Sequence, residues 1–379
     1  MLSLFRVGLK KLCLGWLLKS YARYFAPASK SLPLSPKRIF ILRNNDKGDL
    51  LSTTPFFEAL KKAFPDAEIL VGVGSWNLPI LENNPYVDRI LALDAPWHNK
   101  ALIKPKTNRI LLFLRGFWYS MWSSQVRALR GLRPDIGIDV LGSPQGSMLL
   151  MQAGIPYRLG VRGYAGGHEA CSAFLDFDPS LHVSVFALKF LSLLGKETAV
   201  LPRPQLYMQD SETAYGEAQW IQYTASGHLR IVVAPGGGLK EKCWPVAYFQ
   251  ELIHLIYTHT KACIVLIGSK DEKDLGRRLE AACPFVHNAI GTYNLRESFA
   301  LIQQSSYVIC NSSLAMHVAA AFDKKTLVLL GECFCDARAH ERLWSYPATH
   351  SVLGKNGALS PLASPQQAWE AFQVILGRA

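Results

Sequence analysis

The sequence has no long hydrophobic run near its start. Among the first 25 residues, the longest run without charge is Leu12–Leu18, whereas a membrane-spanning helix needs about 20 apolar residues. A cleaved signal peptide is not indicated either, because Lys and Arg continue beyond the apolar run and no clear small-x-small cleavage site follows. We therefore expect neither a transmembrane anchor nor an export signal in this segment.

Acidic residues are absent from residues 1–38, although the same segment is rich in cations. Eight of the net twelve positive charges lie there, so the rest of the chain is nearly balanced in charge. These cations are Arg6, Lys10, Lys11, Lys19, Arg23, Lys30, Lys37 and Arg38. A nucleic-acid-binding protein would carry basic stripes with interleaved aromatic residues on its folded body. This chain has none, which argues against a nucleic-acid partner.

The first 25 residues mix Leu, Phe and Trp with these cations. On a helical wheel, one face carries Phe5, Leu9, Leu12 and Trp16. Such a face is typical of a helix that lies on an anionic membrane surface; the alternative is a helix that packs on the protein body. Prolines and serines follow, so we expect residues 1–36 to form a basic apolar helix and a linker.

The eight cysteines do not cluster. Cys333 and Cys335 are the only close pair, and one intervening residue without a second pair does not match the ligand spacing of zinc sites. Others, such as Cys263 and Cys310, lie within apolar strand-like runs, which is typical of reduced, buried thiols in a cytoplasmic protein. We therefore expect no metal site and a cytoplasmic location.

The fingerprint of dinucleotide-binding proteins is also missing. Val71–Trp76 has two closely spaced glycines but no third, and Gly236–Gly238 is followed by Leu-Lys-Glu-Lys. Neither segment provides the third glycine that packs the helix against the strand. This argues against an NAD-dependent enzyme.

Strand-like and helical segments alternate through both halves of the 379-residue chain. A chain of this length with 49% hydrophobic residues can bury two cores. The expected strands are Arg38–Leu42, Glu68–Val73, Arg89–Leu93, Ile136–Leu141, Arg230–Ala234, Cys263–Ile267, Tyr307–Cys310 and Thr326–Leu330. The expected helices include Ser52–Phe64, Pro245–Tyr257, Asp271–Ala282 and Leu295–Gln304. The alternation predicts an α/β fold with two parallel sheets.

Arg109–Leu132 is a long aromatic segment that we expect to be helical. Its aromatic residues recur at helical spacing, which favours packing in the core. Because Arg115, Arg127 and Arg130 punctuate it, the alternative is a lid or groove wall that meets a lipid-linked or anionic partner. Asp176-Phe-Asp178 has the form of a short metal-binding pair, and we interpret it as a loop.

The loop after the first expected strand contains Lys47-Gly48-Asp49. Ligands of parallel sheets bind at the carboxyl ends of the strands, which is where this loop lies. Asp49 could accept a proton from an incoming hydroxyl as a general base, or it could cap the helix that follows. We expect that helix to start near Ser52, with Pro55 close to its first turn.

A second glycine-rich turn, Gly236–Gly238, follows the strand-like run Arg230–Ala234. Lys240 and Lys242 come next, so at least one ammonium can meet a diphosphate at this turn. The glycines beside them favour anion binding over the usual fate of a solvated lysine.

A polar turn at residues 311–313 opens another helix. Ser312 and Ser313 can cap this helix, while its free N-terminal amides face the same anion. His317 lies inside the helix, where we expect a hydrogen-bonding core histidine.

In this order and spacing, the motifs resemble those of glycosyltransferase family 9, the ADP-heptose:lipopolysaccharide heptosyltransferases and their relatives. The family's Gly-Asp loop and Thr-Thr-Pro stretch stand here as Lys47–Pro55, and its Asn-Pro-x-Val-Asp motif as Asn84–Asp88. Its Lys-x-Trp-Pro turn stands as Lys242–Pro245, followed by Val265–Gly268. The strand and loop for the nucleotide-sugar stand as Val308–His317.

The resemblance implies a GT-B fold, with two facing Rossmann-like domains and a deep cleft between them. The expected domains are an acceptor domain at residues 37–205 and a nucleotide-sugar domain at 206–362. A C-terminal helix at residues 363–379 often returns to the first domain in such folds.

The resemblance also implies an inverting, metal-independent transfer of heptose from ADP-heptose to a lipid-linked lipopolysaccharide core. The donor is a co-substrate, and no cofactor is implied. Asp49 would be the general base, and Lys242 would stabilise the diphosphate leaving group. The implied donor-binding residues are Gly236, Gly237, Gly238, Lys240, Asn311, Ser312, Ser313, Leu314 and His317. The implied acceptor-side residues are Asn45, Lys47, Gly48 and Thr53.

Two residues depart from the family pattern, which usually has Asn-Asp-Ser-Gly where this chain has Asn311-Ser-Ser-Leu314. Ser312 replaces an acid that can hold sugar hydroxyls, and Leu314 replaces a glycine that admits the donor closely. Two alternatives follow: the same fold with another nucleotide-sugar, or a catalytically silent nucleotide-sugar binding protein.

Overall fold

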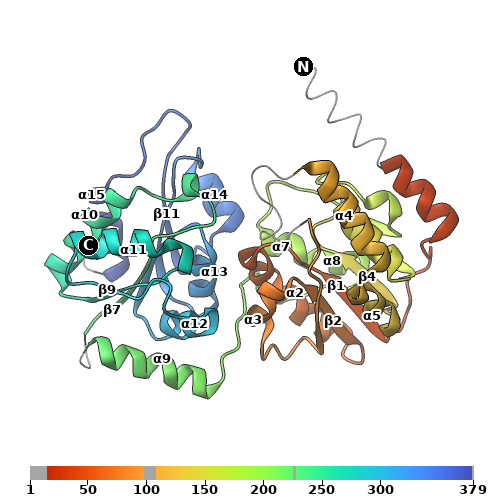
Figure 1. The fold of residues 1–379 in the computed structure, drawn as a ribbon, viewed down its shortest axis with the longest axis horizontal. Coiled ribbons are helices and arrows are strands. Elements are labelled where there is room, and N and C mark those ends of the chain that lie inside the picture. The colour runs from red at the N-terminus through yellow and green to blue at the C-terminus, as the bar shows by residue number, and fades with distance from the viewer. Residues whose placement is uncertain (1–14, 98–107, 225–227, 378–379) are drawn as a thin grey trace. The chain divides into compact units, whose positions relative to one another are not determined.

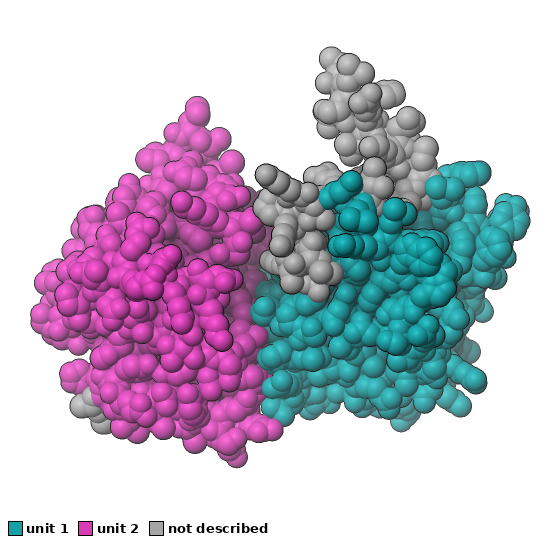
Figure 2. Space-filling view, viewed as in Figure 1, with its two compact units in different colours: residues 1–202 teal, residues 203–379 magenta. Residues whose placement is uncertain are grey.

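Two parallel sheets organise the computed structural model, which describes residues 15–97, 108–224 and 228–377. The chain divides into two compact units, residues 1–202 and 203–379, coloured separately in Figure 2. Each unit contains one six-stranded sheet with helices on its faces (Figure 1). The α/β prediction is therefore confirmed.

The first sheet has the strand order β3-β2-β1-β4-β5-β6. All of its strand pairs are parallel. The strands are β1 (Arg38–Leu42), β2 (Glu68–Val73), β3 (Arg89–Ala92), β4 (Ile136–Asp139), β5 (Tyr157–Arg162) and β6 (Ala173–Asp176). Four of them were expected from the sequence, whereas β5 and β6 were not. Asp176 ends β6 and pairs with Arg162 of β5, so the interpretation of this residue as part of a loop was wrong.

Alternate residues of β1 face opposite layers of helices, as expected for a strand buried on both sides. Phe40 and Leu42 pack with residues of α5 (Ser124–Leu132) and α6 (Pro144–Gln152). Further helices of the unit are α2 (Lys47–Ala63), α3 (Leu78–Leu81), α4 (Arg109–Trp122), α7 (Val183–Leu188) and α8 (Phe190–Leu193). Phe56 of α2 meets Phe190 of α8.

Helix α2 begins earlier than the sequence indicated, at Lys47 instead of Ser52. Pro55 therefore lies inside the helix and not near its first turn, where it removes the amide that would donate to the carbonyl of Leu51. The Thr54 hydroxyl donates to this carbonyl at 2.8 Å, which compensates for the missing amide. The Thr-Thr-Pro stretch is thus a continuous helix with a repaired hydrogen bond.

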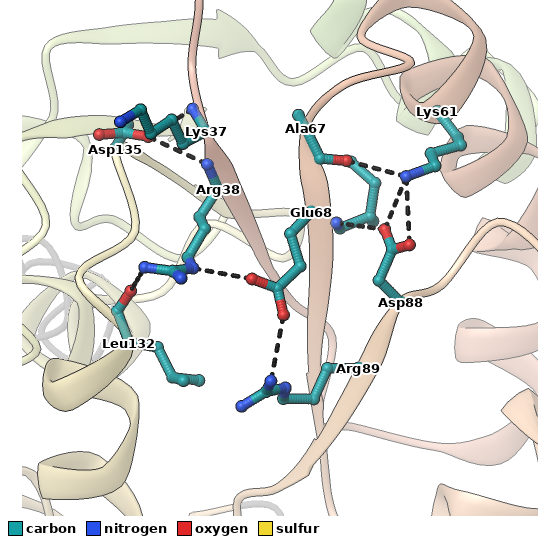
Figure 3. A network of polar contacts seen from close by, with 10 residues as sticks. Lys37, Arg38, Lys61, Ala67, Glu68, Asp88, Arg89, Leu132 and Asp135 are labelled. Atoms are coloured by element: carbon teal, nitrogen blue, oxygen red, sulfur yellow. Dashed lines mark hydrogen bonds and ion pairs between the residues drawn. The ribbon is translucent and has the colours of Figure 1, made fainter.

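Ion pairs join the amino ends of β1, β2 and β3 (Figure 3). Arg38 and Arg89 both pair with Glu68, at 2.7 and 3.3 Å. The carboxylate of Asp88 pairs with Lys61 at 2.9 Å and accepts a backbone amide of β2 at 2.7 Å. Asp88, the last residue of the Asn-Pro-x-Val-Asp motif, therefore fastens the edge of the sheet that lies opposite the carboxyl ends of the strands.

A helix at residues 15–25 packs on the first unit. Leu18 and Ala22 are buried against Met151 of α6, and the amide of Gln152 donates to the Tyr21 hydroxyl at 2.7 Å. The part of this helix that the structure describes thus packs on the body. Phe5, Leu9 and Leu12 of the predicted membrane face lie outside the described residues.

The segment Arg109–Leu132 forms two helices, α4 and α5, separated by Ser123, whose hydroxyl caps α5 by accepting the Gln125 amide at 3.1 Å. The expectation that its aromatic stripe packs in the core was wrong. Trp118 and Trp122 are 59% and 48% exposed, because α4 turns its small residues toward the protein.

The second sheet has the order β12-β11-β10-β7-β8-β9, again entirely parallel. Its strands are β7 (Arg230–Ala234), β8 (Cys263–Leu266), β9 (His287–Asn288), β10 (Tyr307–Asn311), β11 (Lys325–Leu329) and β12 (His350–Leu353). Its helices are α9 (Asp210–Tyr223), α10 (Val246–Thr260), α11 (Lys273–Ala282), α12 (Leu295–Gln303), α13 (Leu314–Ala321), α14 (Ala337–Trp344) and α15 (Pro365–Leu376).

The C-terminal helix α15 belongs to the core of the second unit. Trp369 and Phe372 pack there with α10 and with strand residues such as Ile309 and Leu327. The resemblance suggested that this helix returns to the first domain, and that stays a prediction.

The described residues contain no helix that is long and apolar enough to cross a membrane. Their seven cysteines are all free thiols. Cys263 and Cys310 are buried, as their strand-like surroundings indicated. Cys283 is also buried, whereas Cys333 and Cys335 are exposed.

Candidate functional site

The candidate residues gather where the strand order of each sheet reverses. In the first sheet the chain moves outward from β1 to β2 and β3 and then returns to the other side of β1 with β4. In the second sheet β7 and β10 stand in the same relation. The carboxyl ends of strands at such switch points form the usual ligand sites of open α/β sheets. After the roles that the resemblance predicts for them, we call these two places the acceptor half-site and the donor half-site.

Asp49 occupies the third position of α2, at the acceptor half-site. Its carboxylate accepts the Asn45 amide at 2.7 Å and lies 3.9 Å from the Arg43 guanidinium. The side chain is 23% exposed, so solvent and ligands can reach it. The helix N-cap is Asp46 and not Asp49. The capping interpretation of Asp49 is therefore wrong.

The other predicted acceptor-side residues share this first turn. Lys47 and Gly48 are the first two residues of α2 and are half-buried. The carbonyl of Asn45 accepts the Asn77 amide and the Trp76 indole N–H, at 2.8 and 3.1 Å, which fixes the loop.

Thr53 was also predicted on the acceptor side. It is fully buried, and its hydroxyl donates to the Asp49 carbonyl at 2.8 Å. It therefore supports the helix beneath Asp49.

Asp139 is a residue of this half-site that the sequence did not reveal. It ends β4 and is 1% exposed, and its carboxylate accepts the backbone amides of Leu141 and Ser143 at 3.1 and 2.8 Å. Burial raises the pKa of Asp139, while these amides and Arg43 oppose the rise. The buried Arg43 guanidinium thus lies 3.9 Å from the Asp49 carboxylate and also opposes the rise in the pKa of Asp139.

Asn311 joins two loops of the donor half-site. It is fully buried at the end of β10, and its amide donates to the carbonyls of Pro235 and Gly236 at 2.7 and 3.1 Å. Its carbonyl accepts the Trp244 amide at 2.9 Å. The side chain therefore positions the glycine turn and the Lys-x-Trp-Pro turn relative to each other.

The glycine turn is closely packed. A side chain at Gly236 would lie 1.9 Å from the Glu272 carboxylate, and one at Gly237 would lie 3.0 Å from the Cys243 sulfur. A side chain at Gly236 would therefore displace the Glu272 carboxylate, which caps its own turn by accepting the Ser269 amide at 2.7 Å. Gly238 completes the turn.

Lys240 and Lys242 lie on one short 3₁₀ turn, Lys240–Lys242. Lys240 is exposed, whereas Lys242 is half-buried. The Gly331 amide donates to the Lys242 carbonyl at 3.1 Å, and a side chain at Gly331 would come within 2.5 Å of the Cys243 carbonyl. The loop after β11 therefore holds the backbone of Lys242 in place.

His340 of α14 is the second residue that the sequence did not reveal. It is 5% exposed, and its Nε2 lies 2.7 Å from the Ser312 hydroxyl. Burial, together with the nearby Lys242 ammonium, lowers the pKa of His340 to about 4. Its Nδ1 is buried without a hydrogen-bond partner. We assign the proton to Nε2, because an unpaired acceptor costs less than an unpaired N–H donor.

This tautomer donates to the Ser312 oxygen, which leaves the Ser312 proton available for another acceptor. Ser312 is half-buried, and we expected it to cap α13. The N-cap is instead Ser313, with no hydrogen bond from its side chain to the helix. Leu314 is the first residue of α13 and is half-buried.

His317 lies inside α13, as expected. It is 5% exposed, and its Nδ1 lies 3.2 Å from the Tyr346 hydroxyl. Its position as a hydrogen-bonded core histidine is confirmed.

No cluster of three or more His, Cys, Asp or Glu side chains with the geometry of a metal site occurs among residues 15–97, 108–224 and 228–377.

A family model for glycosyltransferase family 9 (heptosyltransferase) matches residues 122–338, which is more than half of the chain. The chain belongs to glycosyltransferase family 9. The match includes the loops of the donor half-site from Gly236 to Leu314. It ends at Arg338, two residues before His340.

Curated relatives of this family 9 member are heptosyltransferases. Lipopolysaccharide heptosyltransferase 2 of Salmonella typhimurium is 24% identical over 306 residues, covering 78% of this chain and 82% of the relative. Lipooligosaccharide heptosyltransferase 2 of Haemophilus influenzae is 25% identical over 306 residues, covering 77% and 83%.

Solved structures agree with the GT-B fold class of the family. The E. coli ADP-heptose lipopolysaccharide heptosyltransferase II has a TM-score of 0.68 at 20% identity, covering 90% of this chain and 99% of that one. The family 9 protein of Veillonella parvula has a TM-score of 0.74 at 18% identity, covering 90% and 98%. The predicted fold class is therefore confirmed.

Proposed function

We propose that this family 9 enzyme transfers heptose from ADP-heptose to a lipopolysaccharide core acceptor. The observation that carries the proposal is the pairing of family membership with chemistry at both switch points: a reachable carboxylate on the first unit and a lysine beside a glycine turn on the second. The relatives named above carry heptosyltransferase names, and another E. coli heptosyltransferase was solved with ADP.

In this proposal Asp49 is the general base. Its carboxylate takes the proton of the acceptor hydroxyl as that oxygen attacks the anomeric carbon of the donor. Asn45 and Arg43 orient the carboxylate, and the first turn of α2 supports it from below through Thr53. The attack comes from the face opposite the leaving group, so the anomeric configuration inverts.

The diphosphate leaves with its charge stabilised at the donor half-site. Lys242 supplies a positive charge, and the free amides at the start of α13 supply hydrogen bonds. Because the negative charge on the leaving oxygen grows as the glycosidic bond breaks, these groups stabilise the transition state more than the bound donor.

Ser312 takes the place of an acid in the family's usual pattern. With His340 donating to its oxygen, Ser312 can donate its proton to a sugar or phosphate oxygen of the donor. This substitution favours two alternatives with the same fold. One is an enzyme that uses another nucleotide-sugar, and the other is a protein that binds the donor without transfer.

The acceptor is lipid-linked, so we place the enzyme on the cytoplasmic face of the inner membrane. The basic N-terminal segment, residues 1–25, provides the attachment in this proposal, since it combines apolar residues with cations and contains no acid.

Thermal stabilisation by a panel of nucleotides and nucleotide-sugars tests the donor assignment. ADP and ADP-heptose should stabilise the protein more than the UDP, GDP and CDP compounds do. A ligand at one hundred times its dissociation constant raises the free energy of unfolding by about 2.7 kcal/mol. Lys242→Gln should weaken this stabilisation, whereas Lys325→Gln, exposed at the amino end of β11, is the matched control. Preference for another nucleotide would reassign the donor, and no response would contradict the proposal.

A further inference from the structure

Helix α4 turns its apolar side away from the protein. Leu111, Leu114, Trp118 and Trp122 recur at intervals of three and four residues and are 45%, 46%, 59% and 48% exposed. The inner side of the helix holds Gly116, which is buried, and Ser120, which is 1% exposed, while Tyr119 packs against the core. A surface helix normally buries its apolar stripe, so this helix has the inverse pattern.

The helix at residues 15–25 also exposes large apolar residues. Its buried side holds Leu18 and Ala22, while Trp16, Leu17 and Tyr24 are 68%, 57% and 73% exposed. The rings of Trp118 and Trp122 stack at 4.1 Å, so the exposed aromatic residues of α4 form a compact patch. Single exposed apolar residues are ordinary, whereas two helices that both expose such residues mark a binding surface.

Both helices pack against α6, which places them on the same face of the first sheet (Figure 1). The N-terminal helix contacts Met148 and Met151 of α6, and α4 contacts α6 as well. We call the exposed residues of the two helices the aromatic-basic surface. It consists of Trp16, Leu17, Lys19, Arg23 and Tyr24 with Leu111, Leu114, Arg115, Trp118 and Trp122.

The charges on this surface have one sign. Residues 108–134 contain five arginines and no Asp or Glu, and residues 15–25 contain Lys19 and Arg23 and no acid. Arg115, Arg127, Lys19 and Arg23 are exposed. An acid that lies close to the surface is Glu169, next to Gly15, and its carboxylate accepts the Gly167 amide at 3.1 Å.

We propose that the aromatic-basic surface docks on an anionic lipid bilayer. Trp and Tyr side chains are suited to the boundary between headgroups and acyl chains, and Lys and Arg meet the lipid phosphates. A predominantly cationic rim around exposed aromatic residues is complementary to such a surface and not to a neutral or basic one. The inference deepens the proposed function, because it names the surface through which the enzyme reaches a lipid-linked acceptor.

The surface is also coupled to the acceptor half-site. The Tyr119 hydroxyl of α4 donates to Gln125 at 2.6 Å, and the same oxygen of Gln125 accepts the backbone amide of Asp94 at 3.0 Å. The Asp94 carboxylate in turn accepts the Ser75 amide at 2.7 Å. These loops follow the carboxyl ends of β2 and β3, so the docked helix is fastened to the edge of the sheet that carries Asp49.

Vesicle co-sedimentation of the full chain tests the proposal. The wild type should bind vesicles of phosphatidylglycerol and phosphatidylcholine and should bind pure phosphatidylcholine vesicles weakly. Trp118→Ser with Trp122→Ser should lower the partition coefficient by about tenfold. Arg115→Gln and Arg23→Gln should each lower it by about fivefold. Ile221→Ser, which removes a 64% exposed side chain from α9 of the second unit, is the matched control.

Three results would overturn the proposal. The tryptophan and arginine variants could bind as well as the wild type; the wild type could bind neutral vesicles equally well; or the tryptophan variant could abolish a dimer seen by light scattering, which would assign the surface to a second copy. Folding of each variant is checked by its unfolding midpoint. Transfer to a delipidated core oligosaccharide separates membrane docking from the proposed function. The rate of this transfer should be unchanged in these variants. If the wild type does not catalyse it, the proposed function is contradicted, whereas the result for vesicle binding still stands.

Discussion

Asp49 owes its position to the early start of α2. The sequence suggested a loop aspartate before a helix at Ser52, but the helix begins at Lys47 and places Asp49 on its first turn. A carboxylate at a helix N-terminus is favoured by the free amides and by the helix dipole. The same local geometry therefore stabilises the ionised form that a general base needs.

Asp49→Asn should abolish transfer without unfolding the protein. The amide cannot take the proton of the acceptor, so kcat should fall by about 10²- to 10⁴-fold. The free energy of unfolding should change by no more than about 1 kcal/mol, since the side chain is partly exposed and its ion pair is long. Steady-state kinetics and denaturant unfolding measure the two effects.

Asp46→Asn, three residues earlier at the N-cap, is the control and should retain most of its activity. Normal turnover in the Asp49 variant would refute the assignment of the base.

His340 should make stability depend on pH. Its pKa is about 4 in the folded protein and 6.5 in its ordinary state, so the unfolded chain binds the proton first as the pH falls. Stability is complete above about pH 6.5 and should decline toward pH 4, by about 3 kcal/mol in total. Unfolding midpoints measured across this range should show the decline in the wild type.

The variant His340→Gln should lack this component, because its amide does not titrate. An identical pH profile in the two proteins would show that other groups cause the decline.

The sequence could predict Asp49 but not His340. Asp49 lies within a local motif after a recognisable strand, whereas His340 reaches Ser312 across 28 residues through the packing of α14. Asp139 is similar, since only the pairing of β1 with β4 brings it close to Arg43. Tertiary contacts of this kind leave no periodic or spacing signal along the chain.

At the scale of elements, the loop after β11 supports the turn that carries Lys242. Gly331→Ala would place a methyl group 2.5 Å from the Cys243 carbonyl and 2.6 Å from the carbonyl carbon of Lys242. Both neighbours are backbone atoms, so the turn itself must shift. We expect a loss of about 1–3 kcal/mol in unfolding free energy and a higher KM for the donor.

Gly131→Ala in α5 is the control, because no atom lies within 4 Å of the added methyl group and alanine favours the helix. A Gly331→Ala protein with an unchanged KM for the donor would contradict the supporting role of this loop.

The strands that could be predicted from the sequence are rich in apolar and β-branched residues. β1, β2, β7 and β10 were visible in this way. β5 was not, because Arg158 interrupts its apolar pattern; the residue is 1% exposed and donates to the carbonyls of Ala170, Ile155 and Ala26. Helix α4 was predicted as a helix, but its buried face was predicted wrongly. An apolar stripe indicates the buried face of a helix only when the opposite face is exposed to water alone.

Across the whole molecule, the two units repeat one topology. In each sheet the first strand of the unit lies in the middle, with the next two strands on one side of it and the last three on the other. In each unit a candidate functional loop follows this first strand. Because both loops follow a buried strand and open a helix, the two turns share a local pattern that is recognisable in the sequence although they lie far apart in the chain. In the proposed function, the choice of nucleotide and sugar depends on side chains such as Ser312, which topology does not determine.

A transfer assay decides whether this protein is a heptosyltransferase. The purified protein is incubated with ADP-heptose and a lipopolysaccharide core acceptor that lacks the terminal heptose, and the products are analysed by mass spectrometry and by ADP release. We expect an acceptor heavier by one heptosyl residue, with an equal amount of ADP and with inverted anomeric configuration. No heptosyl product from any core acceptor, with the donor still bound to the folded protein, would contradict the proposed function.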